Sequence, residues 1–228
     1  RGFGCLCMAW AMEDCEIPGK IFTLDYTTHE KLREWSIQRD SNGKPTTEFV
    51  SRQMVWDDLG QSSWLKHIET LTWYSSEIMS KKEFPKIEFC YVDGAHFYEG
   101  VKHDFYAFLK IAAEDFSVLF DDYAKRQGYG VNKFVDDEIS NNFETVLIRT
   151  DINKLINALE NSSDPDAGMV WIESKSLKQP LTSAYPEEMR NQFLKKYQLF
   201  EKRLKIRDKL NEKIPILRKV KFSKYLRL

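Results

Sequence analysis

The chain has 228 residues, of which 42% are hydrophobic and 14% aromatic, so it can bury a substantial core and is not intrinsically disordered. It contains no run of 18 apolar residues, and its first residues do not have the pattern of a signal peptide. We therefore expect a cytoplasmic protein without a membrane span. Four cysteines in a chain of this length exclude a disulfide framework, and their spacing fits no zinc site.

The formal net charge is only −1, but the charges are unevenly distributed. Residues 187–228 contain 14 basic and 5 acidic side chains, a net charge of +9, whereas residues 1–186 carry a net charge of −10. Such a basic segment is typical of a solvated helix, and it also suits contact with an acidic partner, nucleic acid, a membrane face or a second copy of the chain. We do not expect nucleic acid to be the partner.

Apolar runs and turn signals predict the secondary structure in chain order. A buried helix over 5–13 is followed by a strand over 20–25, loops and helix over 27–63, a strand over 67–73, and a helix that begins near Ser75 or Ser76. Further strands are predicted over 86–93, 116–122, 144–150 and 168–174, with a surface loop or lid over 125–134 and a helix over 152–160. A helical stripe follows the strand at 86–93 and consists of Val101, Phe105, Phe108, Leu109 and Ala112.

Alternating strands and helices over about 180 residues predict an α/β fold with a Rossmann-like, mostly parallel sheet and helices on both faces. We expect one domain over residues 1–180 and a basic helical C-terminal extension over residues 181–228. In such folds, ligands bind at the carboxyl ends of the strands. Four acids close predicted strands at this edge, namely Asp25, Asp93, Asp121 and Asp122.

The first group of candidate residues suits a nucleoside. Gly2 and Gly4 form a glycine turn before a helix, and Asp25 follows about 20 residues later at a strand end. The backbone of such a turn lies close to the ligand, and the acid accepts hydrogen bonds from ribose hydroxyls. A glycine turn before a helix is equally common as a purely structural feature.

The second group of candidate residues suits a metal ion. Asp93, Asp121 and Asp122 provide hard oxygen ligands, which favour Mg²⁺ or another hard divalent cation, and carboxylates that lie together repel unless a cation or proton joins them. His96 follows three residues after Asp93 and is a candidate base or additional ligand. It is also a candidate surface or helix-capping histidine.

The stretch YVDGAHFYEGVKHDF, followed after a helix by VLFDDY, resembles the class I S-adenosylmethionine-dependent methyltransferases with a D-G-x-H-x-Y-x-x-V-x-x-D motif. This group is related to macrocin O-methyltransferase-like and cephalosporin-hydroxylase-like enzymes. RGFGCLCMAWA resembles the end of the glycine-rich first motif, and KIFTLD resembles the acidic second motif. The resemblance covers roughly residues 1–175.

The resemblance implies a role for each matching residue. Gly2 and Gly4 would lie under the methionine part of the cofactor, Asp25 would hold the ribose, and Tyr74 and Ser75 would lie beside the adenine. The remaining residues would form the catalytic centre, in which the expected metal ligands are Asp93, Asp121 and Asp122, the catalytic residues are Asp93 and His96, and Asp93 also contacts the cofactor.

Two features depart from the family pattern. The strand that precedes the glycine turn is missing, so the sequence resembles an N-terminally truncated copy, and Trp73 stands where relatives commonly have glycine. The expected activity is metal-assisted O-methylation of a hydroxyl on a small molecule or sugar, with S-adenosylmethionine and Mg²⁺ as cofactors. One alternative is a non-catalytic binding or scaffold domain with a basic tail. Another is a dinucleotide-dependent oxidoreductase, which would explain Gly2, Gly4 and Asp25 but not the other acids.

Overall fold

The computed structural model describes residues 2–25, 27–39, 45–72, 75, 83–124, 130–148 and 168–178, together with five single positions between 191 and 206. Of residues 34–39 and 45–47 it describes the backbone alone. The chain divides into two compact units, residues 1–81 and residues 82–228, and we consider each by itself. None of the described helices has the length and apolar character needed to cross a bilayer.

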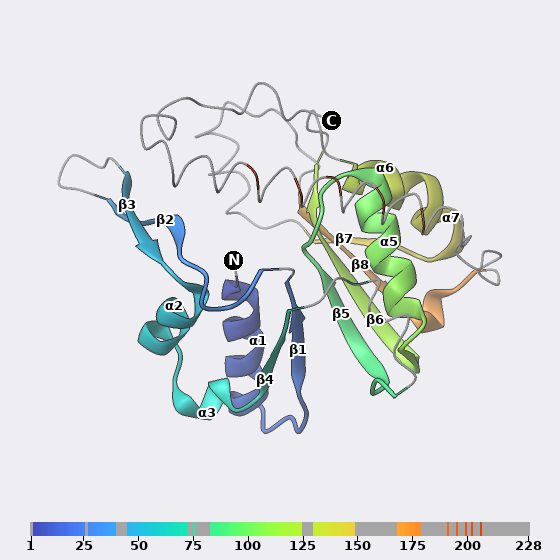
Figure 1. Cartoon of the computed structure of the whole chain (residues 1–228). Helices are drawn as coiled ribbons and strands as arrows, with labels where there is room; N and C mark the ends of the chain where they lie inside the picture. The colour runs from blue at the N-terminus through green and yellow to red at the C-terminus, as the bar shows by residue number, and fades with distance from the viewer. Residues whose placement is uncertain are drawn as a thin grey trace. The chain divides into compact units, whose positions relative to one another are not determined.

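The named elements within the described residues of the first unit are a parallel strand pair, a hairpin and the helices α1, α2 and α3 (Figure 1). Its elements are α1 (Phe3–Asp14), β1 (Ile21–Leu24), β2 (Arg33–Arg39), β3 (Pro45–Val50), α2 (Arg52–Leu59), α3 (Ser62–Leu65) and β4 (Ile68–Leu71). Strands β1 and β4 are parallel, and Ile21 pairs with Ile68. The predicted helix over 5–13 and the strands over 20–25 and 67–73 are thus confirmed, each within about two residues at its ends.

The antiparallel pair β2 and β3 differs from the prediction, which placed loops and helix over residues 27–63. The sequence REWSIQR alternates apolar and polar residues, which is the period of a strand, and a turn-forming stretch follows it. These two signals together indicate a hairpin. Ser51 then caps α2, because its Oγ accepts a hydrogen bond from Met54 N–H at 3.1 Å.

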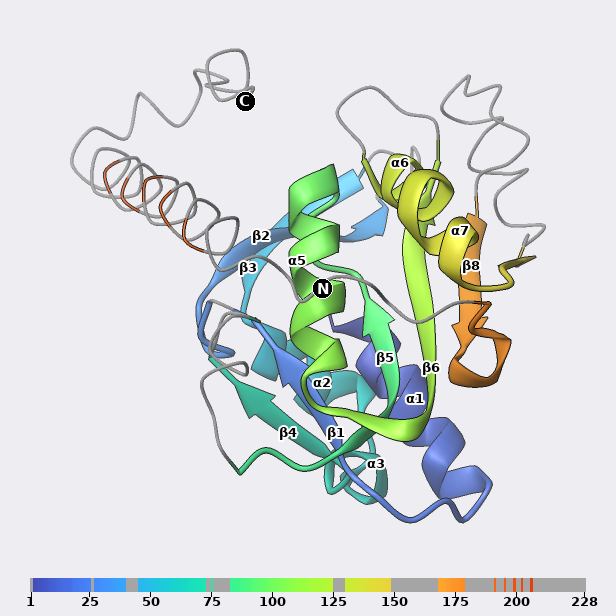
Figure 2. The same ribbon diagram turned by 90° about the vertical axis from the view of Figure 1, so that its right-hand side faces the viewer.

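The second unit is a four-stranded sheet covered by helices (Figures 1 and 2). Its elements are β5 (Ile87–Val92), α5 (Tyr98–Leu109), β6 (Ala112–Tyr123), α6 (Val131–Phe134), the π-helix η1 (Val135–Ile139), α7 (Ser140–Asn142), β7 (Val146–Ile148), β8 (Gly168–Glu173) and the 3₁₀ turn η2 (Ser174–Ser176). The strand order is β5-β6-β8-β7. β5 and β6 run parallel, whereas β8 is antiparallel to both of its neighbours, so the α/β class is confirmed with a mixed sheet.

Aromatic side chains form the core between this sheet and its helices. Phe105 of α5 is fully buried and its ring packs against Phe120, Phe134 and Phe143. The predicted helical stripe is confirmed through Leu109, but α5 ends there and Ala112 begins β6, so its assignment to the helix was wrong.

Part of the predicted loop over 125–134 is instead a buried helix. Residues 125–129 lie outside the described residues, but Val131 and Phe134 are buried in α6, so this part does not form a surface loop or lid. The predicted helix over 152–160 also lies outside the described residues. In the C-terminal extension, the positions that are described are helical, namely Asn191, Lys195, Leu199, Lys202 and Ile206.

Candidate active site

Three side chains in the second unit form a compact group at the carboxyl ends of β5 and β6. Asp93, His96 and Asp122 each place one potential ligand atom so that these atoms all lie within 4.8 Å of one another. Val92 pairs with Phe120 in the parallel register, so Asp93 and the acids near the end of β6 begin side by side. We call Asp93, His96 and Asp122 the acid–histidine cluster.

A β-bulge explains why Asp122, rather than Asp121, belongs to the cluster. In the pairing of β6 with β8, Phe120 lies opposite Val170 and Tyr123 lies opposite Gly168, which leaves one extra residue on β6. Asp122 has a φ of 53°, in the left-handed region that non-glycine residues rarely adopt. The extra residue breaks the alternation of side chains along the strand, and the Asp122 carboxylate reaches His96.

Asp121 has other partners. Its Oδ2 accepts a hydrogen bond from the Tyr91 hydroxyl, and its Oδ1 accepts one from the backbone N–H of Asp122 at 2.8 Å. Burial, followed by the hydrogen bond to Asp121, raises the pKa of Tyr91 far above its ordinary value. The Tyr91 phenol therefore stays protonated and remains a donor to Asp121.

Burial and the neighbouring carboxylates shift the pKa values of His96 and Asp93. His96 Nδ1 lies 3.0 Å from Asp122 Oδ2, and this hydrogen bond raises the pKa of His96 despite its partial burial. The pKa of Asp93 is also raised, first by the partial desolvation of its carboxyl group and then by the charge of Asp121. Neighbouring carboxylates contribute to both shifts, and a proton or a cation would relieve the repulsion among them.

Glycines allow the loop that carries His96 to pack closely. The backbone N–H of Gly130 donates to the carbonyl of His96 at 2.6 Å, and a Cβ at Gly130 would lie 2.2 Å from the backbone nitrogen of Tyr98. A Cβ at Gly94 would lie 2.6 Å from Asp104 Oδ2. Gly130 is therefore required for the loop to keep this path, because a Cβ there would meet backbone atoms, whereas at Gly94 the Asp104 side chain would have to move.

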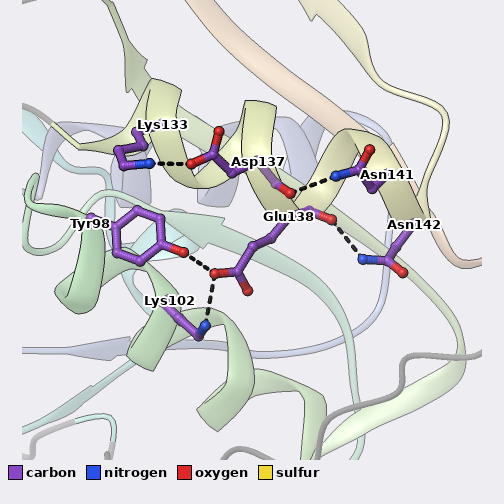
Figure 3. Close-up of polar contacts among 7 residues, drawn as sticks. All are labelled: Tyr98, Lys102, Lys133, Asp137, Glu138, Asn141 and Asn142. Atoms are coloured by element: carbon purple, nitrogen blue, oxygen red, sulfur yellow. Dashed lines mark hydrogen bonds and ion pairs between the residues drawn. The ribbon is translucent and has the colours of Figure 1, made fainter.

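The π-helix η1 is linked to the start of α5 by a half-buried polar network (Figure 3). The Glu138 carboxylate accepts from the Tyr98 hydroxyl and, at 2.7 Å, from Lys102 Nζ. Next to this network, Lys133 pairs with Asp137 on the exposed side of the same segment (Figure 3). Because α5 begins two residues after His96, the Glu138 network restrains the element that follows the cluster.

The first unit holds the residues predicted for the cofactor. Gly2 is the N-cap of α1 with a φ of 88°, and a Cβ there would lie 2.9 Å from both Arg52 and Trp56 side-chain atoms. Asp25 follows β1, and its carboxylate accepts from the backbone N–H of Thr27 at 2.8 Å and from Arg52 at 2.5 Å. Sequence reasoning missed Arg52 and Trp56, although their spacing of four residues places both on one face of α2.

The structure thus groups only some of the predicted residues. Asp93, His96 and Asp122 lie together, Asp121 is engaged by Tyr91, and Gly2, Gly4 and Asp25 belong to the other compact unit. Gly4 lies in the first turn of α1. Of the two residues predicted beside the adenine, Tyr74 lies outside the described residues and Ser75 is helical and partly buried.

Parallel strands that end in acids, with a glycine turn at a helix start, define a class of α/β domains that bind nucleotide-like cofactors. Residues 1–123 match a family model described as a methyltransferase domain, and the match extends from α1 to the end of β6. The chain belongs to this methyltransferase family, and such enzymes use S-adenosylmethionine as methyl donor. A comparison with curated proteins gives no significant match.

The residues of the first unit fit the cofactor that the family uses. The positive φ of Gly2 and the lack of space for a Cβ are features of a turn where the backbone approaches a ligand. Trp56 Nε1 and both ring nitrogens of His29 are buried polar atoms with no hydrogen-bond partner among the described residues. The side chain of Asp25 remains 26% exposed, which leaves acceptor capacity for hydroxyl groups.

The acid–histidine cluster also fits a divalent cation. Carboxylate oxygens suit Mg²⁺, and a set of two carboxylates with one imidazole additionally suits Mn²⁺ or Zn²⁺.

Proposed function

We propose that the protein methylates a hydroxyl group of a small molecule or sugar, with assistance from a hard divalent cation such as Mg²⁺. The observation that carries this proposal is the convergence of Asp93, His96 and Asp122 at the ends of two parallel strands in a methyltransferase domain. The D-G-x-H motif at Asp93 to His96 supports it further, because it resembles the macrocin O-methyltransferase-like and cephalosporin-hydroxylase-like relatives.

In this proposal the side chains of the second unit prepare the acceptor. Asp93 and Asp122 hold the cation, with Asp121 as the third predicted ligand when it is released from Tyr91. A bound Mg²⁺ supplies positive charge that favours the deprotonated hydroxyl. His96 is the base, and its hydrogen bond to Asp122 orients the imidazole so that its second nitrogen can accept the acceptor's proton.

The first unit holds the methyl donor in the same proposal. Gly2 and Gly4 lie under the methionine part, Asp25 accepts from the ribose hydroxyls, and Tyr74 and Ser75 flank the adenine. S-adenosylmethionine, when bound, supplies an electrophilic methyl group, so the protein needs mainly to align this group with the acceptor oxygen. The proposed domain covers residues 1–180, and residues 181–228 form a basic extension.

Metal binding by the cluster can be tested without knowing the acceptor. We expect Mn²⁺ titrated into the wild-type protein to bind, as measured by calorimetry or electron paramagnetic resonance. Asp122→Asn should weaken this affinity at least about tenfold, because it removes a charged ligand and the partner of His96. Asp115→Asn is the matched control, since Asp115 lies near the other end of β6 and its side chain is 77% exposed.

Equal Mn²⁺ affinity in all three proteins would contradict the metal assignment.

The transfer reaction itself is tested with labelled S-adenosylmethionine and a panel of phenolic and sugar hydroxyls, with and without a chelator. If S-adenosylhomocysteine produces no binding heat, the non-catalytic scaffold function replaces the proposed one.

A further inference from the structure

Trp56 of α2 presents a buried donor that the fold itself does not use. The residue is 3% exposed, and its Nε1 has no hydrogen-bond partner among the described residues. Burial of an N–H group without a partner costs free energy, and nearly all such groups in native proteins are paired. An unpaired donor of this kind is therefore a candidate contact for a ligand.

The Trp56 donor lies beside the start of α1. An ideal Cβ built on Gly2 would lie 2.9 Å from Trp56 Nε1, and Gly2 is the N-cap of that helix. The indole N–H is thus next to the backbone of the glycine turn. Any larger residue at position 2 would overlap the indole, so glycine at this position lets the turn and the buried donor lie side by side.

The start of α1 is itself suited to an anion. The helix has 12 residues, no acidic residue in its first turn, and no side chain that caps its N-terminus. Its first N–H groups point along the axis and give this end a partial positive charge. The Trp56 donor and the helix start therefore favour the same kind of ligand group, an acceptor that carries negative charge.

Asp25 has the opposite preference, for a ligand group that donates hydrogen bonds. Asp25 is an acceptor and attracts hydroxyl or ammonium donors, and the nearby Arg52 guanidinium is already bonded to Asp25. A ligand that carries both a diol and a carboxylate would therefore place the diol at Asp25 and the carboxylate at Trp56. S-adenosylmethionine has this combination of groups.

We propose that Trp56 Nε1–H donates a hydrogen bond to the carboxylate of the amino-acid part of S-adenosylmethionine, at the glycine turn before α1. This inference rests on the proposed function, because it assumes that the first unit holds this cofactor. It assigns a binding role to a residue from the helix that follows the β2–β3 hairpin.

Two ligands and two variants test the proposal. S-adenosylhomocysteine carries the amino-acid carboxylate, whereas 5′-methylthioadenosine has the same nucleoside but lacks that carboxylate. Trp56→Phe removes the N–H and keeps an aromatic ring. Trp64→Phe is the control, since the Trp64 ring packs at a tilt against Trp10 and is not fully buried. Each full-length protein is checked for folding by circular dichroism and titrated with each ligand by calorimetry.

We expect Trp56→Phe to weaken S-adenosylhomocysteine about tenfold and to leave 5′-methylthioadenosine unchanged, whereas Trp64→Phe should change neither affinity. Equal weakening of both ligands would overturn the carboxylate assignment and indicate a contact with the nucleoside. Unchanged affinity for both ligands would overturn it as well and indicate that a water satisfies the indole.

A measurement on the wild-type protein covers the case in which Trp56→Phe does not fold. The chain has six tryptophans, and the Trp56 indole signal in a ¹⁵N-correlated spectrum can be assigned by elimination from the five other Trp→Phe variants. We expect S-adenosylhomocysteine to shift this signal downfield and 5′-methylthioadenosine to leave it in place. No shift, or the same shift with both ligands, would overturn the proposal.

The test separates this inference from the proposed function. If wild type and Trp56→Phe bind S-adenosylhomocysteine equally, the Trp56 contact is wrong and the methyltransferase proposal is unaffected. If the wild-type protein binds neither ligand, the proposed function fails and the Trp56 assignment fails with it.

Discussion

At the scale of single residues, two adjacent aspartates of β6 have different surroundings. Asp122 faces His96, whereas Asp121 accepts hydrogen bonds from Tyr91 and from the Asp122 backbone. The difference arises from the left-handed backbone at Asp122 and the extra residue that it accommodates. Asp121 and Asp122 are identical and adjacent, yet they have different partners because the backbone orients their side chains in different directions.

His29 provides a residue-scale prediction on pH. Its imidazole is buried, and this burial, together with the nearby Arg52 charge, lowers its pKa. The folded state therefore resists protonation, while the unfolded chain takes up a proton near pH 6.5. Stability from this group is present above that pH and is lost as the pH falls below it.

We expect the unfolding free energy of the wild-type protein to decrease more between pH 8 and pH 5 than that of His29→Phe, which keeps an aromatic ring against Trp56. Urea titrations at both pH values measure the difference. The same decrease in both proteins would show that His29 does not contribute to the pH dependence.

The positions of the acids could be predicted from the sequence, but their individual roles could not. An aspartate after an apolar run indicates the end of a strand, and parallel strands bring such ends together. The sequence around Asp121 and Asp122 does not indicate a bulge, because a bulge depends on how β6 pairs with β8, about 50 residues later in the chain. Arg52 and Trp56 were missed because the amphipathic pattern that indicates a helix within residues 27–63 does not show which of its side chains lie against Gly2.

At the scale of elements, the π-helix η1 is stabilised by contacts with α5. Lys102 and Glu138 are 16% and 22% exposed, so this pair is largely removed from water, whereas Lys133 and Asp137 are 64% and 48% exposed (Figure 3). Burial makes the first pair expensive to break, because one charge would remain without its partner. Solvent screens the second pair.

This contrast predicts unequal effects of two substitutions in η1. Glu138→Ala should destabilise the protein by about 2 kcal/mol, because it leaves Tyr98 and Lys102 without their acceptor. Asp137→Ala, one residue away, should cost about 0.5 kcal/mol or less. Chemical denaturation of both variants measures the difference, and similar losses would mean that the Glu138 network adds no more than a surface pair.

Element prediction succeeded where one periodicity dominated and failed where pairing or burial was decided by distant segments. The apolar runs of β5 and β6 and the stripe from Val101 to Leu109 have clear strand and helix periods. Residues 131–142 follow a glycine-containing stretch that suggests a loop. They become helical because Phe134 and Ile139 fill the core against α5 and the sheet.

At the scale of the whole molecule, the separation of charge predicts an effect of salt. The chain has a sequence pI of about 6.5, with a net charge of +9 in residues 187–228 and −10 in the rest. Near this pH, opposite charges on different copies attract while the net charge is too small to keep the copies apart. We expect light scattering at pH 6.5 to decrease when NaCl is raised from about 50 to about 500 mM, because salt screens this attraction.

The same titration at pH 8.5 is the control, since the net charge is then more negative and the scattering should be low at either salt concentration. Scattering that increases with salt at pH 6.5 would indicate apolar association in place of charge attraction.

The bulge in β6 also affects how substitutions and length changes near it should be understood. Deleting a single residue there would restore the ordinary alternation of side chains along β6. The position of a residue along the strand would then decide which side chain faces His96, whatever its chemistry. Homologous positions in this region therefore have to be matched by their hydrogen-bonded neighbours in β8, because an alignment gap placed one residue away would exchange the acid that faces His96 for its tyrosine-bonded neighbour.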